Sequence, residues 1–113
     1  MKKKKRIVQI PYKVLRIDGD FVDFNSFYEE NKKLIYDSIY ETFLGFLKKD
    51  EDKKLILQVQ ASISEIPWET EFVFVEEDSI ILKRDLMPFY EKNEDYEMCT
   101  KIKELNKVFT NSQ

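Results

Sequence analysis

The sequence contains no histidine, one cysteine (Cys99) and only two glycines, Gly19 and Gly45. Histidine is the usual proton shuttle near neutral pH and the commonest metal ligand, so most familiar catalytic and metal sites are excluded. Two glycines are too few for a loop that wraps a phosphate group. We therefore expect no enzyme activity, no cofactor and no metal. A site built on carboxylates and tyrosines is the only enzymatic alternative left open.

Long hydrophobic runs are also missing, so the sequence predicts no membrane span. The segment after the basic start at residues 2–6 is too short and too polar for a signal peptide. A single cysteine forms no internal disulfide and fits a reducing compartment, so we expect a cytoplasmic protein. At 113 residues, with 42% hydrophobic residues, the chain is expected to form one domain spanning residues 1–113.

The charge is distributed unevenly along the chain. Residues 2–6 contribute five positive charges to a net charge of −3, so the remainder carries −8. An acidic body lacks the basic stripe of a nucleic-acid-binding face, so nucleic acid is a disfavoured partner. We expect residues 1–5 to form a flexible basic arm and residues 110–113 a flexible polar tail.

Alanine is almost absent, since Ala61 is the only one, whereas lysine occurs sixteen times. Alanine has G/C-rich codons, whereas lysine, isoleucine, asparagine, phenylalanine and tyrosine have A/T-rich codons. The composition therefore indicates an AT-rich genome, such as that of a low-GC bacterium or its phage.

The first half of the chain predicts two strands and a long helix. Alternating apolar residues over 6–17 indicate a strand, and Asp18-Gly19 indicates a hairpin turn to a short return strand at 21–24. Ser26 and Glu29 form a capping box at the start of a helix that runs to Lys49. We expect this helix to bury Ile39 and Phe43.

The second half predicts strands at 55–64, 69–75 and 79–84, followed by a helix over 93–109. The expected fold is a two-layer α+β domain of order β-β-α-β-β-β-α. Its antiparallel sheet would have four or five strands, with the long helix across one face.

An apolar strip is expected on the hairpin formed by the last two strands. Both faces of this hairpin are apolar, and Val73, Val75 and Ile81 share one of them. Either the second helix crosses to cover that face, or these residues form a contact surface for another protein or a second copy of the chain. The sequence leaves both alternatives open.

Further candidate interaction residues lie on either side of this strip. Glu69 and Glu71 share a strand face and either solvate it or meet a basic partner. Trp68 either covers one end of the core or anchors an interface. Tyr36 and Tyr40 lie on the flank of the long helix, where they either pack along the edge of its buried face or contact a partner.

Taken together, these features predict a small, acidic, non-enzymatic protein-binding module. We expect it to act as an inhibitor or adaptor of a larger host protein. The alternative is an accessory protein that contacts nucleic acid through the basic arm. Such an arm would make few phosphate contacts, so its binding would be weak and strongly salt-dependent. The solitary Cys99 is expected to be a buried structural thiol, since no histidine is present to activate it.

Overall fold

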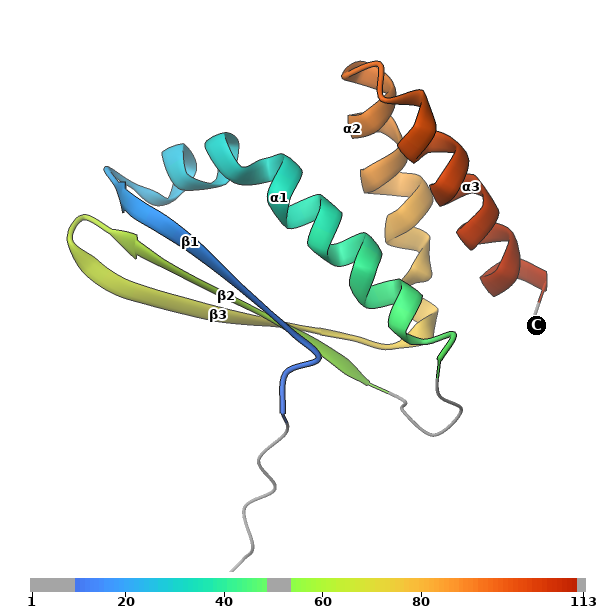
Figure 1. The fold of residues 1–113 in the computed structure, drawn as a ribbon, viewed down its shortest axis with the longest axis horizontal. Coiled ribbons are helices and arrows are strands. Elements are labelled where there is room, and N and C mark those ends of the chain that lie inside the picture. The colour runs from blue at the N-terminus through green and yellow to red at the C-terminus, as the bar shows by residue number, and fades with distance from the viewer. Residues whose placement is uncertain (1–9, 49–53, 112–113) are drawn as a thin grey trace, which may run out of the picture.

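The computed structural model describes residues 10–48 and 54–111, so the predicted arm at 1–5 and the end of the predicted tail lie outside the described residues. The elements in chain order are β1 (Lys13–Phe21), α1 (Phe24–Gly45), β2 (Leu55–Ile63), β3 (Ile66–Phe74), the 3₁₀ turn η1 (Glu76–Ser79), the π-helical turn η2 (Leu82–Leu86), α2 (Met87–Lys92) and α3 (Tyr96–Asn111). Figure 1 shows α1 along one face of the sheet, with α2 and α3 paired beside it. The predicted α+β class is confirmed.

The sheet is smaller than predicted and of mixed direction. Its strand order is β1-β2-β3, with β1 parallel to β2 and β2 antiparallel to β3. The predicted antiparallel sheet of four or five strands is therefore wrong, because the described residues form three strands. Parallel neighbours need a long crossover connection, and α1 supplies it between β1 and β2.

The Asp18-Gly19 pair lies inside β1 and does not form the predicted hairpin turn. The register between β1 and β2 shifts between Arg16 and Asp20, which marks a β-bulge, and Gly19 has a φ of +96°. Bulges and tight turns both place glycine at positive φ, so the same dipeptide suits either structure. The predicted return strand at 21–24 does not form, because β1 continues to residue 21 and α1 begins at residue 24.

The start of α1 lies slightly before the predicted capping box. Asp23 caps the helix, since its Oδ1 accepts the N–H of Ser26 at 2.8 Å. This backbone hydrogen bond stabilises the ionised carboxyl and lowers the pKa of Asp23. The buried face of the helix includes Ile39 and Phe43, as predicted.

Alternate residues of β2 and β3 point toward α1 and build the core with it. Leu57 and Val59 of β2 are buried there, which confirms the predicted inward face of this strand. On β3, the ring of Phe74 lies 5.1 Å from the ring of Phe43.

Residues 79–84, predicted as the last strand, are helical or in helical turns. The run at 80–82 is too short for its periodicity to separate a strand from a helix. Leu82, Leu86 and Tyr90 are spaced four residues apart and have no exposed surface, so they form the buried stripe of a helix.

The π-helical turn η2 ends at Leu86, two residues before Pro88. Here the N–H of Met87 donates to the carbonyl of Leu82, five residues back. Proline has no N–H to donate, and its ring crowds the carbonyl four residues earlier in a regular helix. The wider π turn accommodates this residue within one nearly continuous helical segment.

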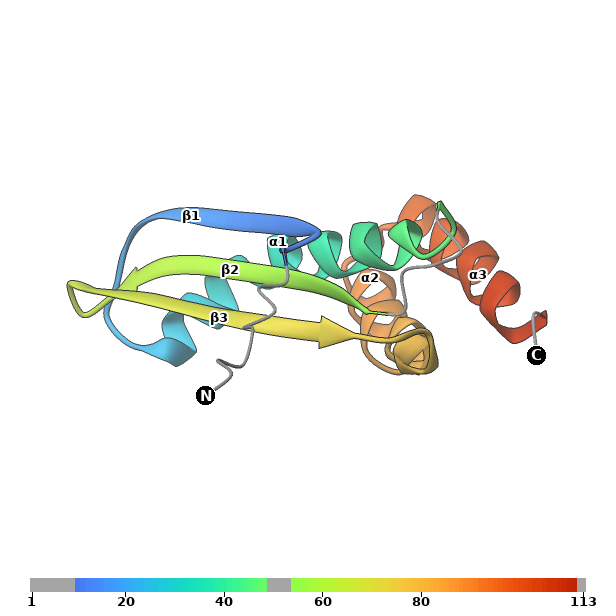
Figure 2. The ribbon, with the colours of Figure 1, turned by 90° about the horizontal axis from the view of Figure 1, so that it is seen from below.

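The second helix predicted from the sequence is present as α3, with Ile102, Leu105 and Phe109 buried. The ring of Phe109 lies 6.0 Å from that of Phe43, so α3 joins the same core as α1. Figure 2 views the opposite face of the sheet, which none of the described helices covers. The alternative in which the second helix crosses to that face is therefore wrong.

Candidate interaction surface

The sheet face opposite α1, which we call the open face, carries polar side chains interspersed with apolar ones, in rows across the strands. The strand registers define the rows as Asp20–Ser62–Pro67, Arg16–Gln60–Glu69, Val14–Gln58–Glu71 and Ile56–Val73. Arg16 of β1 is the single cation in these rows. Neighbouring strands are about 4.8 Å apart, so Arg16 lies two strand spacings from the carboxylates of Glu69 and Glu71 on β3.

Two glutamines of β2 orient the acids of β3. Gln58 Nε2 donates to one carboxylate oxygen of Glu69 and one of Glu71, each at 3.3 Å. Gln60 Nε2 donates to Gln58 Oε1 at 2.7 Å and to Glu69 Oε1 at 3.4 Å. Neutral amides do not cancel the carboxylate charges, and no ion pair with either acid occurs in the described part of the chain. The open face therefore presents two ordered negative charges.

Val73 extends this row of acids along β3 and is 50% exposed. The structure thus brings three of the predicted interaction residues, Glu69, Glu71 and Val73, onto one strand face. Val75 follows β3 and is half-buried, and Ile81 packs against the core from the helical segment. The predicted apolar strip across a final hairpin is not formed, because the second strand of that hairpin is helical.

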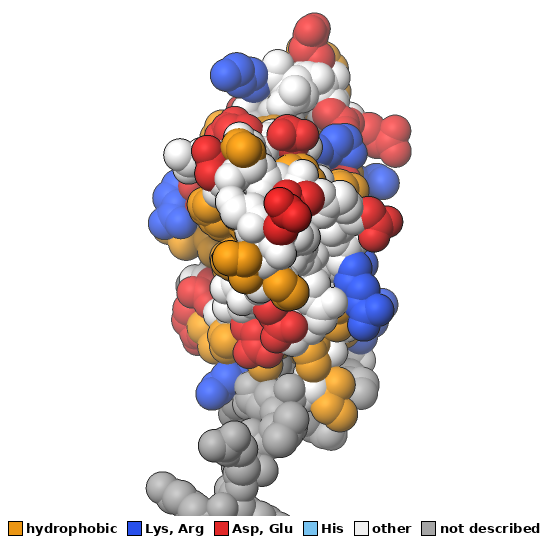
Figure 3. All heavy atoms as spheres, turned by 90° about the vertical axis from the view of Figure 1, so that its left-hand side faces the viewer, with side chains coloured by type: hydrophobic (Ala, Val, Ile, Leu, Met, Phe, Trp, Pro, Cys, Tyr) orange, Lys and Arg blue, Asp and Glu red, His pale blue; other side chains and the backbone are white. Residues whose placement is uncertain are grey.

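The inner side of β3 borders an apolar hollow, which we call the aromatic groove. It has a volume of about 170 Å³ and is lined by Phe24, Phe27, Tyr28, Ile35, Val59, Trp68 and Phe72. Trp68 is half-buried, and its ring lies 5.5 Å from that of Phe24 and 5.3 Å from that of Phe27. Figure 3 looks at the end of the molecule where α1 begins and shows hydrophobic side chains exposed between carboxylates.

The backbone of β3 pairs on one side only, with β2, in unbroken register over nine residues. Its other edge has no strand partner among the described residues. β1 is the second edge of the sheet, but its bulge interrupts the regular spacing of its backbone groups. The more regular edge is therefore the one flanked by the acids and the aromatic groove.

Tyr36 and Tyr40 lie away from the open face, between α1 and the other helices. The ring of Tyr36 meets that of Phe89 edge-on at 5.0 Å, and its hydroxyl lies 3.2 Å from that of Tyr28. Lys32 Nζ lies over both tyrosine rings, 5.4 Å from the centre of Tyr28 and 5.9 Å from that of Tyr36. Burial raises the pKa of Tyr36 and of Tyr40, so both hydroxyls stay protonated.

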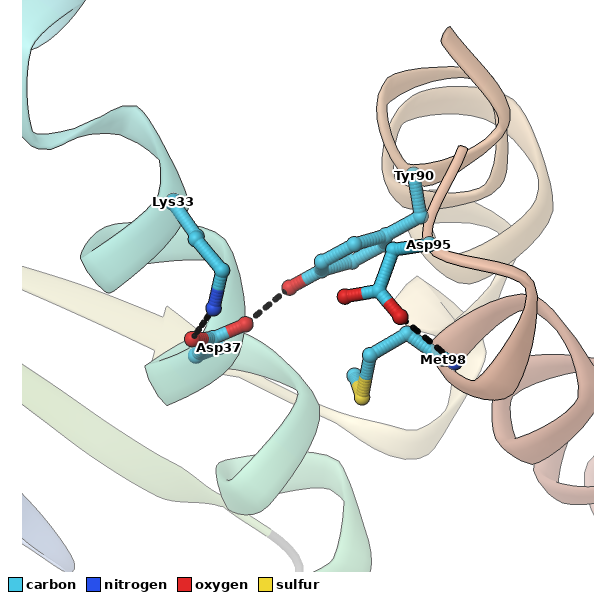
Figure 4. Close-up of polar contacts among 5 residues, drawn as sticks. All are labelled: Lys33, Asp37, Tyr90, Asp95 and Met98. Carbon is cyan, nitrogen blue, oxygen red and sulfur yellow. Dashed lines mark hydrogen bonds and ion pairs between the residues drawn. The ribbon is translucent and has the colours of Figure 1, made fainter. Parts of the chain in front are cut away.

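A polar cluster missed from the sequence ties α2 to α1 (Figure 4). The buried Tyr90 donates its hydroxyl proton to Asp37, whose other carboxylate oxygen accepts from Lys33 at 2.8 Å. Burial raises the pKa of Tyr90, which keeps the hydroxyl a donor. Asp95 lies beside the cluster and accepts the N–H of Met98 at the start of α3. The spacing of Lys33 and Asp37 could have indicated an ion pair, but nothing in the sequence identified Tyr90 as its partner.

A hollow with a volume of about 640 Å³ lies between the 83–91 segment and α3. We call it the helical groove. Met87 and Ile102 lie on its floor, and three lysines that form no described ion pair lie around it, at Lys83, Lys103 and Lys107. Cys99 also lines it, and burial raises the pKa of this thiol, which disfavours the reactive thiolate.

The acids near the start of the chain have local structural roles. Asp20 Oδ1 accepts the hydroxyl of Ser62 at 2.6 Å and the N–H of Glu65 at 2.7 Å, while Asp23 caps α1. Within residues 10–48 and 54–111, no cluster of three or more carboxylate or thiol side chains could hold a metal ion. In the same ranges, no helix has both the length and the apolar character needed to cross a bilayer.

Comparisons of the chain with protein-family models, with characterised proteins and with solved structures found no match.

Proposed function

We propose that this chain is a small protein-binding module whose contact surface is β3 together with the open face beside it. The observation that carries the proposal is the ladder of Gln58, Gln60, Glu69 and Glu71, in which the amides orient two exposed carboxylates on the same strand face as the exposed Val73. On the inner side of the same strand, Ile66 is 65% and Phe72 is 38% exposed. Apolar contacts combined with oriented polar groups are typical of specific protein interfaces.

The orientation of the acids supports a binding role. Acids that only keep an exposed strand soluble need to carry charge, and freely moving carboxylates are sufficient for that purpose. Here the amides of β2 restrict both carboxylates, so a partner that contacts them loses less conformational entropy on binding. The composition indicates an AT-rich genome, such as that of a phage of a low-GC bacterium. We therefore further propose that the partner is a larger protein of the host, which this chain inhibits or recruits.

The proposal is tested by affinity capture from an extract of the native host. Glu69→Lys/Glu71→Lys should lose the captured protein, because charge reversal removes the complementarity at the contact surface. The matched control is Glu29→Lys/Glu30→Lys, which makes the same charge change at exposed positions on α1 and should retain the protein. Equal capture by both variants would overturn the proposal. Salt-sensitive recovery of nucleic acid instead would support a role for residues 2–6.

A further inference from the structure

We infer that the free edge of β3 accepts an extended segment of the partner as a fourth strand, and that basic and apolar side chains alternate along this segment. The inference rests on the proposed function and adds the binding mode and the chemistry of the partner. Three features carry it: the unpaired backbone edge, the acids on one side of β3 and the aromatic groove on the other.

The backbone edge supplies the main-chain hydrogen bonds of strand addition. β3 keeps an unbroken register with β2 from residue 66 to residue 74, so its outer backbone groups are regularly spaced. In this mode of recognition, main-chain hydrogen bonds provide affinity and alternating side-chain sites provide specificity. Pro67 has no N–H, so the edge offers donors from residue 68 to residue 74, which is long enough for several such sites on each side.

The acids select basic residues on the outer side. Glu69 and Glu71 are two residues apart, so they lie about 7 Å from each other along the strand. A neighbouring strand has the same spacing between alternate residues, which places two of its side chains against the two carboxylates. Opposite charges across neighbouring strands stabilise the pair, whereas like charges destabilise it.

The aromatic groove selects apolar residues on the inner side. Trp68 and Phe72 line it from β3, and Phe24 and Tyr28 line it from α1. Its volume of about 170 Å³ is smaller than the roughly 300–1,000 Å³ of small-molecule pockets. The groove therefore suits single side chains inserted from an adjacent strand, spaced alternately with the basic residues.

A second copy of the chain is a poor occupant of this edge. An antiparallel two-fold pair of β3 strands centred on Thr70 would place Glu69 opposite Glu71 of the second copy. The same contact would occur twice by symmetry, so four carboxylates would gather on one face. Like charges in directly opposite positions are destabilising. The acids therefore oppose self-pairing and favour a basic segment.

The test uses a nine-residue peptide with blocked ends, in which lysine and valine alternate, and a matched peptide with glutamate in place of lysine. Trp68 is the only tryptophan of the chain and lines the groove, so its fluorescence reports when the groove is filled. The lysine peptide should bind and shift this fluorescence, and the glutamate peptide should not. Methylating every backbone nitrogen of the lysine peptide should abolish binding, because neither edge of the peptide then retains N–H donors.

Charge reversal in the protein provides the decisive comparison. Glu69→Lys/Glu71→Lys should weaken the lysine peptide by about tenfold or more and allow the glutamate peptide to bind. Glu69→Gln/Glu71→Gln gives an intermediate affinity and serves if the reversed variant does not fold. Glu29→Lys/Glu30→Lys should leave the original preference intact. Peptide binding that does not depend on the charges at positions 69 and 71, or that persists with the methylated peptide, would overturn strand addition.

The remaining outcomes separate this inference from the proposed function. Host capture that depends on Glu69 and Glu71, combined with no peptide binding, would overturn strand addition alone. Peptide binding at β3, combined with capture of a host protein that is unchanged by substitution of Glu69 and Glu71, would overturn the proposed function alone. A second copy that supplies its own residues 2–6 would appear as self-association that is lost on deleting residues 1–6, and this result would overturn the assignment to a partner protein.

Discussion

At the scale of single residues, the aromatic side chains divide between the core and the candidate surface. Phe43 has no exposed surface and meets the rings of Phe46, Phe74 and Phe109. It therefore links α1 to both β3 and α3. Trp68 sits at the boundary, packed on Phe24 and Phe27 while it still borders the aromatic groove.

Truncation of Phe43 to alanine should lower the free energy of unfolding by about 3–5 kcal/mol, because it leaves a cavity among three rings. Val73→Ala on the open face should change it by no more than about 0.5 kcal/mol. Chemical denaturation of both variants measures the difference. A Phe43→Ala protein of nearly unchanged stability would show that the position of α1 is wrong.

Tyr90 makes stability depend on pH in the alkaline range. Burial raises its pKa in the folded protein, so above about pH 10 the unfolded chain releases this proton while the folded chain keeps it. The folded state then binds more protons, and the free energy of unfolding falls as pH rises. Tyr90→Phe should show a shallower alkaline decline than the wild type.

Denaturation between pH 8 and pH 11 measures this effect, with Tyr96→Phe at an exposed position as the control. At neutral pH, Tyr90→Phe should also cost about 1–3 kcal/mol, because Asp37 loses its hydroxyl donor. Identical alkaline slopes for the wild type and Tyr90→Phe would contradict the buried hydrogen bond.

At the scale of elements, the sequence predicted structures whose periodicity was long enough to be unambiguous. The apolar spacing of α1 extends over 22 residues, and the alternation of β2 extends over nine. Both identified the correct buried residues, including Phe43 and Leu57. The acids of β3 were likewise placed on a common strand face, because side chains in a strand alternate with a period of two.

The errors arose where local chemistry permits two structures. Asp-Gly suits a hairpin or a bulge, and the parallel partner of β1 lies more than thirty residues away, where no local pattern indicates it. The short apolar run at residues 80–82 fits a strand or a helix until Leu86 and Tyr90 complete a buried stripe. The aromatic groove and the Tyr90 cluster depend on these tertiary arrangements, so the sequence did not predict them.

Gly19 tests the bulge in β1. A Cβ at this position would meet no atom within 4 Å, so the cost of substitution is purely conformational. With φ at +96°, Gly19→Ala should destabilise the protein by about 1–2 kcal/mol. Gly19→Asn should cost less, because asparagine tolerates positive φ better than alanine. Equal stability of wild type and Gly19→Ala, measured by thermal unfolding, would mean that this backbone conformation is not required.

At the scale of the whole molecule, α1 separates two surfaces of different charge. The open face carries the unpaired acids of β3, whereas the helical groove is bordered by Lys83, Lys103 and Lys107. The helices and the inner sheet face share one core, so substitutions of exposed residues on either surface, such as Glu69 or Thr100, leave that core intact. Each surface can therefore be altered separately, and the contribution of each to binding measured independently.

The most direct test of the contact surface is photo-crosslinking in an extract of the native host. A photoreactive side chain is placed at position 73 on the open face, at position 100 in the helical groove, or at position 30 on α1. We predict that a host protein crosslinks from position 73 and that Glu69→Lys/Glu71→Lys abolishes this product. Crosslinking from position 100 or 30, with none from position 73, would contradict the assignment of β3 and the open face as the contact surface.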